Sequence, residues 1–270
     1  MPFHLGLYEK AAPESFSFEE KLTLAKKCGF DYLEISIDET EEKLSRLYNK
    51  RLSDEIVSAV CKTELPVRTM CLSGHRKFPL GGIDERSLEI MDGALQLADK
   101  LGIRMIQLAG YDVYYEPSTP ETRERFVKNL EKCVKMAATA GVIMGFETME
   151  TDFMNTVEKS VKYINHIRSP YLQIYPDIGN ITNGAQDAVA DLKKGDGHII
   201  AAHLKETVPG RFRDMEYGQG NVDFDGCVAE LMRQKVGMYT CEFWYDGHTE
   251  PLEYVGRNKA YVEKIFARYR

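Results

Sequence analysis

One junction recurs along the chain and constrains its fold more than any other feature. A helical pattern ends at a glycine and an apolar run starts at once, at Gly29, Gly102, Gly141 and Gly237. Glycine just past a helix end can adopt the left-handed conformation that closes the helix, because it has no Cβ. A repeated helix–glycine–strand unit favours a parallel sheet with helices between its strands.

The number and spacing of the apolar runs favour a closed barrel. Helical patterns alternate with the runs, and no linker rich in proline, glycine or serine interrupts them. Eight parallel strands that close on themselves leave no free edge. An open doubly wound sheet would place a glycine-rich phosphate turn after its first strand, and GLYEKAAP is not one. We therefore predict one α/β domain over residues 1–270, a single (β/α)8 TIM barrel. Its strands are expected at 4–7, 32–36, 67–71, 105–108, 143–147, 172–177, 199–204 and 239–243, with a polar segment at 38–50.

Charge and composition narrow the class of protein. The 270 residues carry 35 Lys and Arg against 42 Asp and Glu, a net charge of −7, which disfavours broad nucleic-acid binding. The start, MPFHLGLYEK, lacks the basic and apolar regions of a signal peptide. No apolar run approaches the roughly 20 residues that span a bilayer. The six cysteines are scattered, without a CxxC pair. We expect a cytoplasmic protein that acts without nucleic acid or membrane.

Four potential metal ligands stand at the ends of the last four predicted strands. They are Glu147, Asp177, His203 and Glu242. Side chains at the carboxyl ends of neighbouring parallel strands meet at one end of a barrel. Three carboxylates crowded there would repel one another, and a cation relieves that repulsion. The sequence therefore predicts a site for one divalent ion, and these ligand types accept Zn, Mn, Co or Mg.

Two loops at the same end of the predicted barrel are basic. One follows the third strand, CLSGHRKFPLGG, and the other follows His203, LKETVPGRFR. Local positive charge in an acidic chain suits an anionic substrate, and phosphate needs several donors. Loops after the last two strands are the usual phosphate site of this fold. The candidate substrate- or phosphate-binding residues are Ser73, His75, Arg76, Lys205, Thr207 and Arg211.

Several motifs together resemble one enzyme family. CLSGHRKFPLG, IQLAGYDVYY, YPDIGN, HLKETVPGRF and GQGNVDF resemble the bacterial L-ribulose-5-phosphate 3-epimerases, which act on L-xylulose 5-phosphate in L-ascorbate and L-gulonate catabolism. That family lies in the xylose-isomerase-like barrel superfamily, and the likeness spans essentially the whole chain. The resemblance implies a metal-dependent epimerase of a small ketopentose phosphate, working as a homodimer with Zn or Mn. It places the metal ligands on Glu147, Asp177, His203 and Glu242, and the acid–base pair on Glu147 and Glu242.

The chemistry of C3 epimerisation agrees with that pair. A proton leaves C3, next to the C2 carbonyl, and another returns on the opposite face, which one base cannot do alone. Glu147 and Glu242 flank the other two ligands in strand order.

Three alternatives stay open: an epimerase or isomerase of an unphosphorylated keto-sugar, an apurinic-site endonuclease, and a non-catalytic sugar-binding module. The basic residues of the loops argue against an unphosphorylated substrate. The small number of histidines and the net negative charge argue against an endonuclease. The opposed pair of glutamates argues against a binding module without catalysis.

Overall fold

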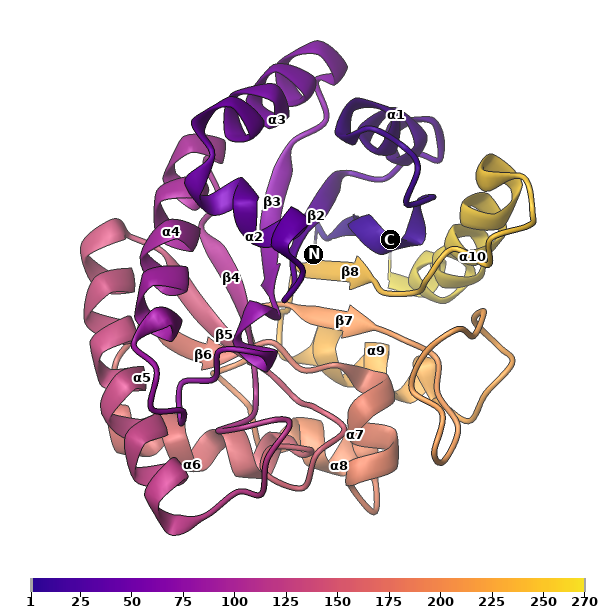
Figure 1. The fold of residues 1–270 in the computed structure, drawn as a ribbon. Helices are drawn as coiled ribbons and strands as arrows, with labels where there is room; N and C mark the ends of the chain where they lie inside the picture. The colour runs from indigo at the N-terminus through magenta and orange to yellow at the C-terminus, as the bar shows by residue number, and fades with distance from the viewer. Residues whose placement is uncertain (1, 270) are drawn as a thin grey trace.

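Eight parallel strands form one curved sheet around a central axis, with helices as an outer ring (Figure 1). The computed structural model describes residues 2–269. Neighbouring strands follow the order β6-β5-β4-β3-β2-β1-β8-β7. Two further parallel bridges, Ile174–Ile199 and Asp177–His203, join the two ends of this order. The predicted TIM barrel is therefore confirmed.

Strands and helices alternate along the chain as the sequence pattern predicted. The strands are β1 His4–Tyr8, β2 Tyr32–Ile37, β3 Val67–Leu72, β4 Met105–Ala109, β5 Ile143–Glu147, β6 Leu172–Ile174, β7 Ala202–Leu204 and β8 Met238–Cys241. The helices are α1 Phe18–Lys27, α2 Glu41–Tyr48, α3 Lys50–Thr63, α4 Arg86–Leu101, α5 Pro120–Ala140, α6 Val157–Ile167, α7 Ile178–Gly184, α8 Ala188–Lys193, α9 Phe224–Arg233 and α10 Pro251–Phe266. Short 3-10 turns cover η1 Glu9–Ala11, η2 Gly74–Arg76 and η3 Ala267–Tyr269.

Three of the four glycine junctions close a helix as expected. Gly29, Gly102 and Gly141 have φ of 75°, 72° and 67°, in the left-handed region where glycine costs least. The expectation for Gly237 is wrong. Helix α9 ends at Arg233, earlier than the pattern indicated, and Lys235 takes the left-handed conformation instead, with φ of 63°.

Two short helices were not expected from the sequence. Helix α2 occupies the polar segment at 38–50, where Thr40 caps its start and Leu44 is among the few side chains it buries. Helix α7 begins directly after Asp177, in a segment expected to follow an extended strand. Strand β6 is correspondingly shorter than predicted, because Pro176 has no N–H with which to continue a ladder. Both helices are too short for hydrophobic periodicity to reveal them.

Strand β2 shows how the barrel separates polar from apolar side chains. Leu33, Ile35 and Ile37 pack in the apolar core between the sheet and the helices. The alternate residues point to the other side of the sheet, because successive side chains of a strand face opposite ways. The hydroxyl of Tyr32 bonds Thr240 on β8, and the carboxylate of Glu34 reaches residues of four other strands or their ends. The barrel interior is thus partly polar.

Candidate metal centre and active site

The four predicted ligands converge at one end of the barrel. Each of Glu147, Asp177, His203 and Glu242 offers an atom, and these atoms all lie within 4.8 Å of one another. Glu147 ends β5, Asp177 precedes α7, His203 lies on β7 and Glu242 follows β8. All four side chains are buried, with at most 6% of any residue exposed. The structure therefore brings together the groups that the strand ends indicated.

Asp177 is oriented by the helix that it caps. Its Oδ1 accepts hydrogen bonds from the backbone N–H groups of Gly179 at 2.8 Å and Asn180 at 3.0 Å, leaving Oδ2 for the cluster. Asp177 Oδ2 and Glu242 Oε2 are buried and have no hydrogen bond of good geometry. They contact the cationic side chains of Lys205 and His203 instead. Buried oxygens with unused lone pairs beside an imidazole fit a divalent cation.

His203 is held at both ring nitrogens. Its Nδ1 lies 2.8 Å from Glu242 Oε2 and 3.2 Å from Glu147 Oε1, so this nitrogen faces the other ligands. Its Nε2 lies 2.6 Å from Oε1 of Glu34. A carboxylate on the far nitrogen fixes the ring orientation and makes the near nitrogen a better metal ligand. Glu34 would thus support His203 as a metal ligand.

Glu34 is a candidate functional residue that the sequence reasoning missed. Its other oxygen, Oε2, accepts hydrogen bonds from Thr69 Oγ1 at 2.7 Å and Tyr175 Oη at 2.8 Å, and the Thr240 hydroxyl lies at 3.3 Å. The residue is completely buried. A charged residue inside the apolar run YLEISI was the available signal, because a buried carboxylate needs partners.

Replacing Glu34 with glutamine is expected to weaken metal binding about 10- to 100-fold. Glutamine keeps the shape of the side chain but removes the negative charge beside His203 Nε2. Competition with a chromophoric zinc chelator measures the affinity without reference to turnover. Glu124→Gln, an exposed change on α5, is the matched control. An affinity of the Glu34 variant equal to that of the control would contradict the supporting role.

The surroundings shift the pKa values of the three carboxylates in the cluster in different directions. Burial raises the pKa of Glu147, and the negative charge of Glu242 adds to the rise. Burial also raises the pKa of Asp177 well above its ordinary value, despite the nearby Lys205. Burial opposes ionisation of Glu242 too, but Lys205 and His203 hold its pKa below the ordinary value. Like charges therefore crowd this site as the sequence analysis expected, and a divalent cation would relieve them.

A pocket opens above the four ligands. Of the predicted substrate-binding residues, Ser73, Arg76 and Lys205 line it. Glu147 and Glu242, predicted as metal ligands, also line it, whereas the predicted substrate-binding set does not include the other lining residues. The remaining lining residues are Tyr8, Lys10, Cys71, Met149, Glu150, Asn180, Phe212, Arg213 and Trp244.

The other three predicted substrate-binding residues lie outside this lining. His75 is buried, and its Nε2 lies 2.9 Å from the carbonyl oxygen of Ser87. Thr207 is buried, and its hydroxyl donates to the carbonyl of Gly179 at 2.9 Å. Arg211 is exposed, and its guanidinium donates to backbone carbonyls of its own loop. These three side chains therefore support the loops around the pocket.

The buried position of His75 makes part of the stability depend on pH. Burial lowers the pKa of His75 to about 4, against about 6.5 in an unfolded chain. The folded protein therefore binds this proton less readily, and stability is lost as pH falls through that interval. The free energy of unfolding should fall between roughly pH 7 and pH 4.5 in both proteins. We expect this fall to be about 2 kcal/mol smaller in His75→Gln than in wild type. Urea unfolding at both pH values measures this, and equal losses would contradict the prediction.

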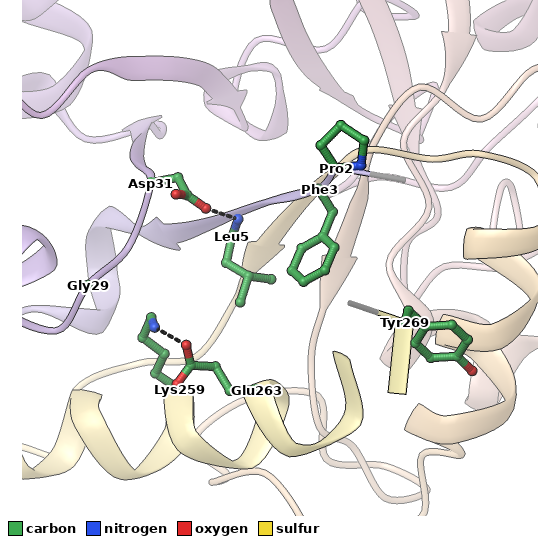
Figure 2. A pocket seen from close by; sticks show the side chains of 8 residues that line it. All are labelled: Pro2, Phe3, Leu5, Gly29, Asp31, Lys259, Glu263 and Tyr269. Atoms are coloured by element: carbon green, nitrogen blue, oxygen red, sulfur yellow. Dashed lines mark hydrogen bonds and ion pairs between the residues drawn. The ribbon is translucent and has the colours of Figure 1, made fainter. Parts of the chain in front are cut away.

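A second pocket, at the opposite end of the barrel, has its charges paired (Figure 2). The Asp31 carboxylate accepts a hydrogen bond from the backbone N–H of Leu5 at 2.8 Å. Lys259 forms an ion pair with Glu263 at 2.6 Å. In this fold the end of the barrel where strands begin serves stability, and the chemistry lies where they end. The pocket above the ligands is therefore the candidate active site.

The model of the xylose isomerase-like TIM barrel family matches residues 22–265, and the chain belongs to that family. The chain is 42% identical to the L-ribulose-5-phosphate 3-epimerase UlaE of Escherichia coli strain SMS-3-5. The match covers 98% of this chain and 95% of that protein. The corresponding Salmonella heidelberg protein is 43% identical over 97% of this chain and 95% of its own.

Solved structures confirm the fold at much lower identity. The D-allulose 3-epimerase from Methylomonas sp., solved in complex with D-allulose, superposes with a TM-score of 0.78 at 16% identity. The match covers 98% of this chain and 99% of that one. Across residues 2–269, no helix is both long and apolar enough to cross a membrane.

Proposed function

We propose that this protein is a metal-dependent 3-epimerase that interconverts L-ribulose 5-phosphate and L-xylulose 5-phosphate. The observation that carries the proposal is the placement of two glutamates, Glu147 and Glu242, in one buried cluster with Asp177 and His203. Relatives at 42–43% identity over nearly the whole chain are named for this reaction. The family resemblance further supports a role in L-ascorbate catabolism and a cytoplasmic homodimer.

The two glutamates would act as an acid–base pair. One carboxylate removes the C3 proton, and the electron pair of the broken C–H bond moves toward the C2 carbonyl to give an enediolate. The other glutamate, in its acid form, donates its proton to the opposite face of C3 and restores the ketone. Glu147 at the end of β5 and Glu242 after β8 flank Asp177 and His203 in strand order, which suits one carboxylate on each face of C3.

Glu147, Asp177, His203 and Glu242 would hold the divalent ion, with Zn or Mn as the first candidates. A cation bound there would stabilise negative charge on the C2 and C3 oxygens. Lys205 lies 3.7 Å from Glu242 Oε2 and also contacts Asp177, so its ammonium would add positive charge beside the reacting carbons. Tyr8 and Trp244, whose ring centroids lie 5.9 Å apart, would cover the sugar and exclude water.

Proton NMR in D2O tests the proposal directly. Metal-loaded protein is incubated with L-xylulose 5-phosphate, and both deuterium at C3 and formation of L-ribulose 5-phosphate are followed. Deuterium at C3 together with the epimer is the expected result. Neither exchange nor product in the loaded protein would contradict the assigned substrate, and L-xylulose without phosphate is the comparison in the same experiment.

A further inference from the structure

A second group of buried charges lies beside the candidate active-site pocket, around Glu9 in the turn η1. The Glu9 side chain is completely buried, and no more than 11% of the Lys21, Lys43 or Arg46 side chain is exposed. Glu9 Oε1 lies 3.1 Å from Nζ of Lys21 and 2.6 Å from Nζ of Lys43. Burial opposes ionisation, but the three cations hold the pKa of Glu9 well below its ordinary value. One ionised carboxylate therefore serves three buried cations.

The guanidinium of Arg46 binds both oxygens of this carboxylate. Its Nη1 donates to Glu9 Oε2 at 2.7 Å, and its Nη2 donates to Oε1 at 2.9 Å. The backbone N–H of Ser36 also donates to Oε2, at 2.9 Å. A contact through two oxygens fixes direction as well as distance. The cations come from α1 and α2 and the N–H from β2, so Glu9 joins turn η1 to three neighbouring elements.

The residues on either side of Glu9 line the pocket, whereas Glu9 itself is not among the lining residues. The Tyr8 hydroxyl lies 3.3 Å from Oγ of Ser36, the residue whose N–H donates to Glu9. The other neighbour, Lys10, has its Nζ 2.5 Å from Asp38 Oδ2. Turn η1 therefore contributes Tyr8 and Lys10 to the pocket wall, while Glu9 holds the turn from behind.

The contacts of turn η1 continue to the loop after β8. The backbone N–H of Tyr245 donates to the carbonyl of Lys10 at 3.1 Å. The ring of Trp244 meets the ring of Tyr8 edge-on, with 5.9 Å between their centroids. Trp244 also lines the pocket, two residues after the candidate ligand Glu242. A shift of turn η1 would therefore move the pocket wall beside both β1 and β8.

Stability alone does not account for a charged network at this place. Buried charged side chains lose their hydration, and apolar residues of similar volume often give a fold that is at least as stable. Cations that share one carboxylate do, however, fix a single arrangement of the chain around it. Reactions that depend on the placement of groups around the substrate benefit from such a fixed arrangement.

We propose that Glu9 is a positioning residue of the candidate active site: it fixes turn η1 and thereby holds Tyr8 and Trp244 at the pocket wall. Glu9 acts through these neighbours, so the affinity for metal should not depend on it. The effect on turnover rests on the proposed function. The effect on the pocket wall does not, because the surroundings of Trp244 can be measured without substrate.

Fluorescence and kinetics test the proposal together. Trp244 is the single tryptophan of the chain, so its fluorescence reports on the pocket wall. In Glu9→Gln we expect acrylamide to quench this fluorescence more strongly than in wild type, because the turn beside the ring is no longer fixed. The kcat/KM for L-ribulose 5-phosphate should fall about 10- to 100-fold. The zinc affinity, measured by competition with a chromophoric chelator, should stay at the wild-type value.

Glu230→Gln is the matched control. Glu230 on α9 is also buried and paired, with Arg233 at 2.8 Å, but it is not among the residues that line the pocket. Its replacement should lower stability and leave both the quenching of Trp244 and kcat/KM unchanged. Quenching and kcat/KM in Glu9→Gln equal to those of the control would leave Glu9 with a structural role only and overturn the proposal.

Glu9→Asp keeps the proposal testable if Glu9→Gln does not fold. Aspartate retains the negative charge that the buried cations need, but its side chain is one methylene shorter and cannot reach all the donors around Glu9. Quenching should increase and kcat/KM should fall, each by less than in a variant without the charge. Wild-type values of both quantities in Glu9→Asp would overturn the proposal.

The two readouts separate this inference from the proposed function. If Glu9→Gln or Glu9→Asp increases the quenching of Trp244 but wild type epimerises neither L-ribulose 5-phosphate nor L-xylulose 5-phosphate, the positioning role stands and the proposed reaction fails. If wild type epimerises these sugars but neither variant changes quenching or kcat/KM, the reaction stands and the positioning role is wrong.

Discussion

Replacing Glu242 with glutamine is expected to lower kcat for epimerisation by at least about a thousandfold. Glutamine has nearly the same shape and keeps a carbonyl oxygen toward the cluster, but it can neither take nor give the C3 proton at neutral pH. Glu147→Gln should have an equally large effect, because both faces of C3 need a group of their own. The metal content of each purified variant is measured as well. A variant that keeps its metal but loses its activity lacks the group that transfers the proton.

Deuterium exchange gives this pair of variants a sharper readout than turnover. With one glutamate left, an epimer whose C3 proton faces that glutamate should still exchange with D2O without forming product. Glu242→Gln should therefore retain exchange for one epimer, and Glu147→Gln for the other. Glu124→Gln on α5 is the control and should exchange and epimerise both. Full epimerisation by either active-site variant would contradict the two-base scheme.

Metal removal is expected to lower the free energy of unfolding by about 3 kcal/mol, relative to protein with free metal at roughly a hundredfold its dissociation constant. The expected stabilisation arises because the ion binds the folded protein, which gathers Glu147, Asp177 and Glu242 around one point, and does not bind the unfolded chain. Urea unfolding with EDTA, and again after zinc is restored, measures the difference.

Asp177→Asn is the matched variant for this experiment. The amide oxygen can still accept from the backbone of α7, as Asp177 Oδ1 does now, so the start of the helix is preserved. The second carboxylate oxygen is lost, so the variant should show a smaller gain on adding zinc. Identical unfolding curves for wild type with EDTA and with zinc would contradict the metal site.

The presence of the eight strands and the convergence of the four candidate ligands could be predicted because both depend on local sequence. An apolar run that ends in Glu147 or His203 is visible within a few residues, and parallel strands bring such ends together without further information. Glu34 could not be assigned in this way. Its partner His203 is 169 residues away in the chain, so only the closed barrel reveals what its charge is for.

The choice between Arg211 and Arg213 shows a second limit. The two residues stand two positions apart in one polar loop, and neither belongs to a helical or alternating pattern. Which one faces the pocket depends on the turn between Val208 and Arg211 and on the left-handed backbone of Asp214. Non-glycine residues adopt that conformation rarely, so sequence reasoning had no ground to expect it there.

The polar interior beneath the cluster separates residues whose substitution affects many partners from residues that can be substituted one at a time. Glu34 ties His203 to Thr69, Tyr175 and Thr240, so a substitution deep in the barrel would also disturb the candidate metal centre above it. Arg76 and Arg213 stand on loops and contact ring faces at the rim of the pocket. Laboratory evolution toward new sugars should therefore accumulate changes in those rim loops while the inner residues stay invariant.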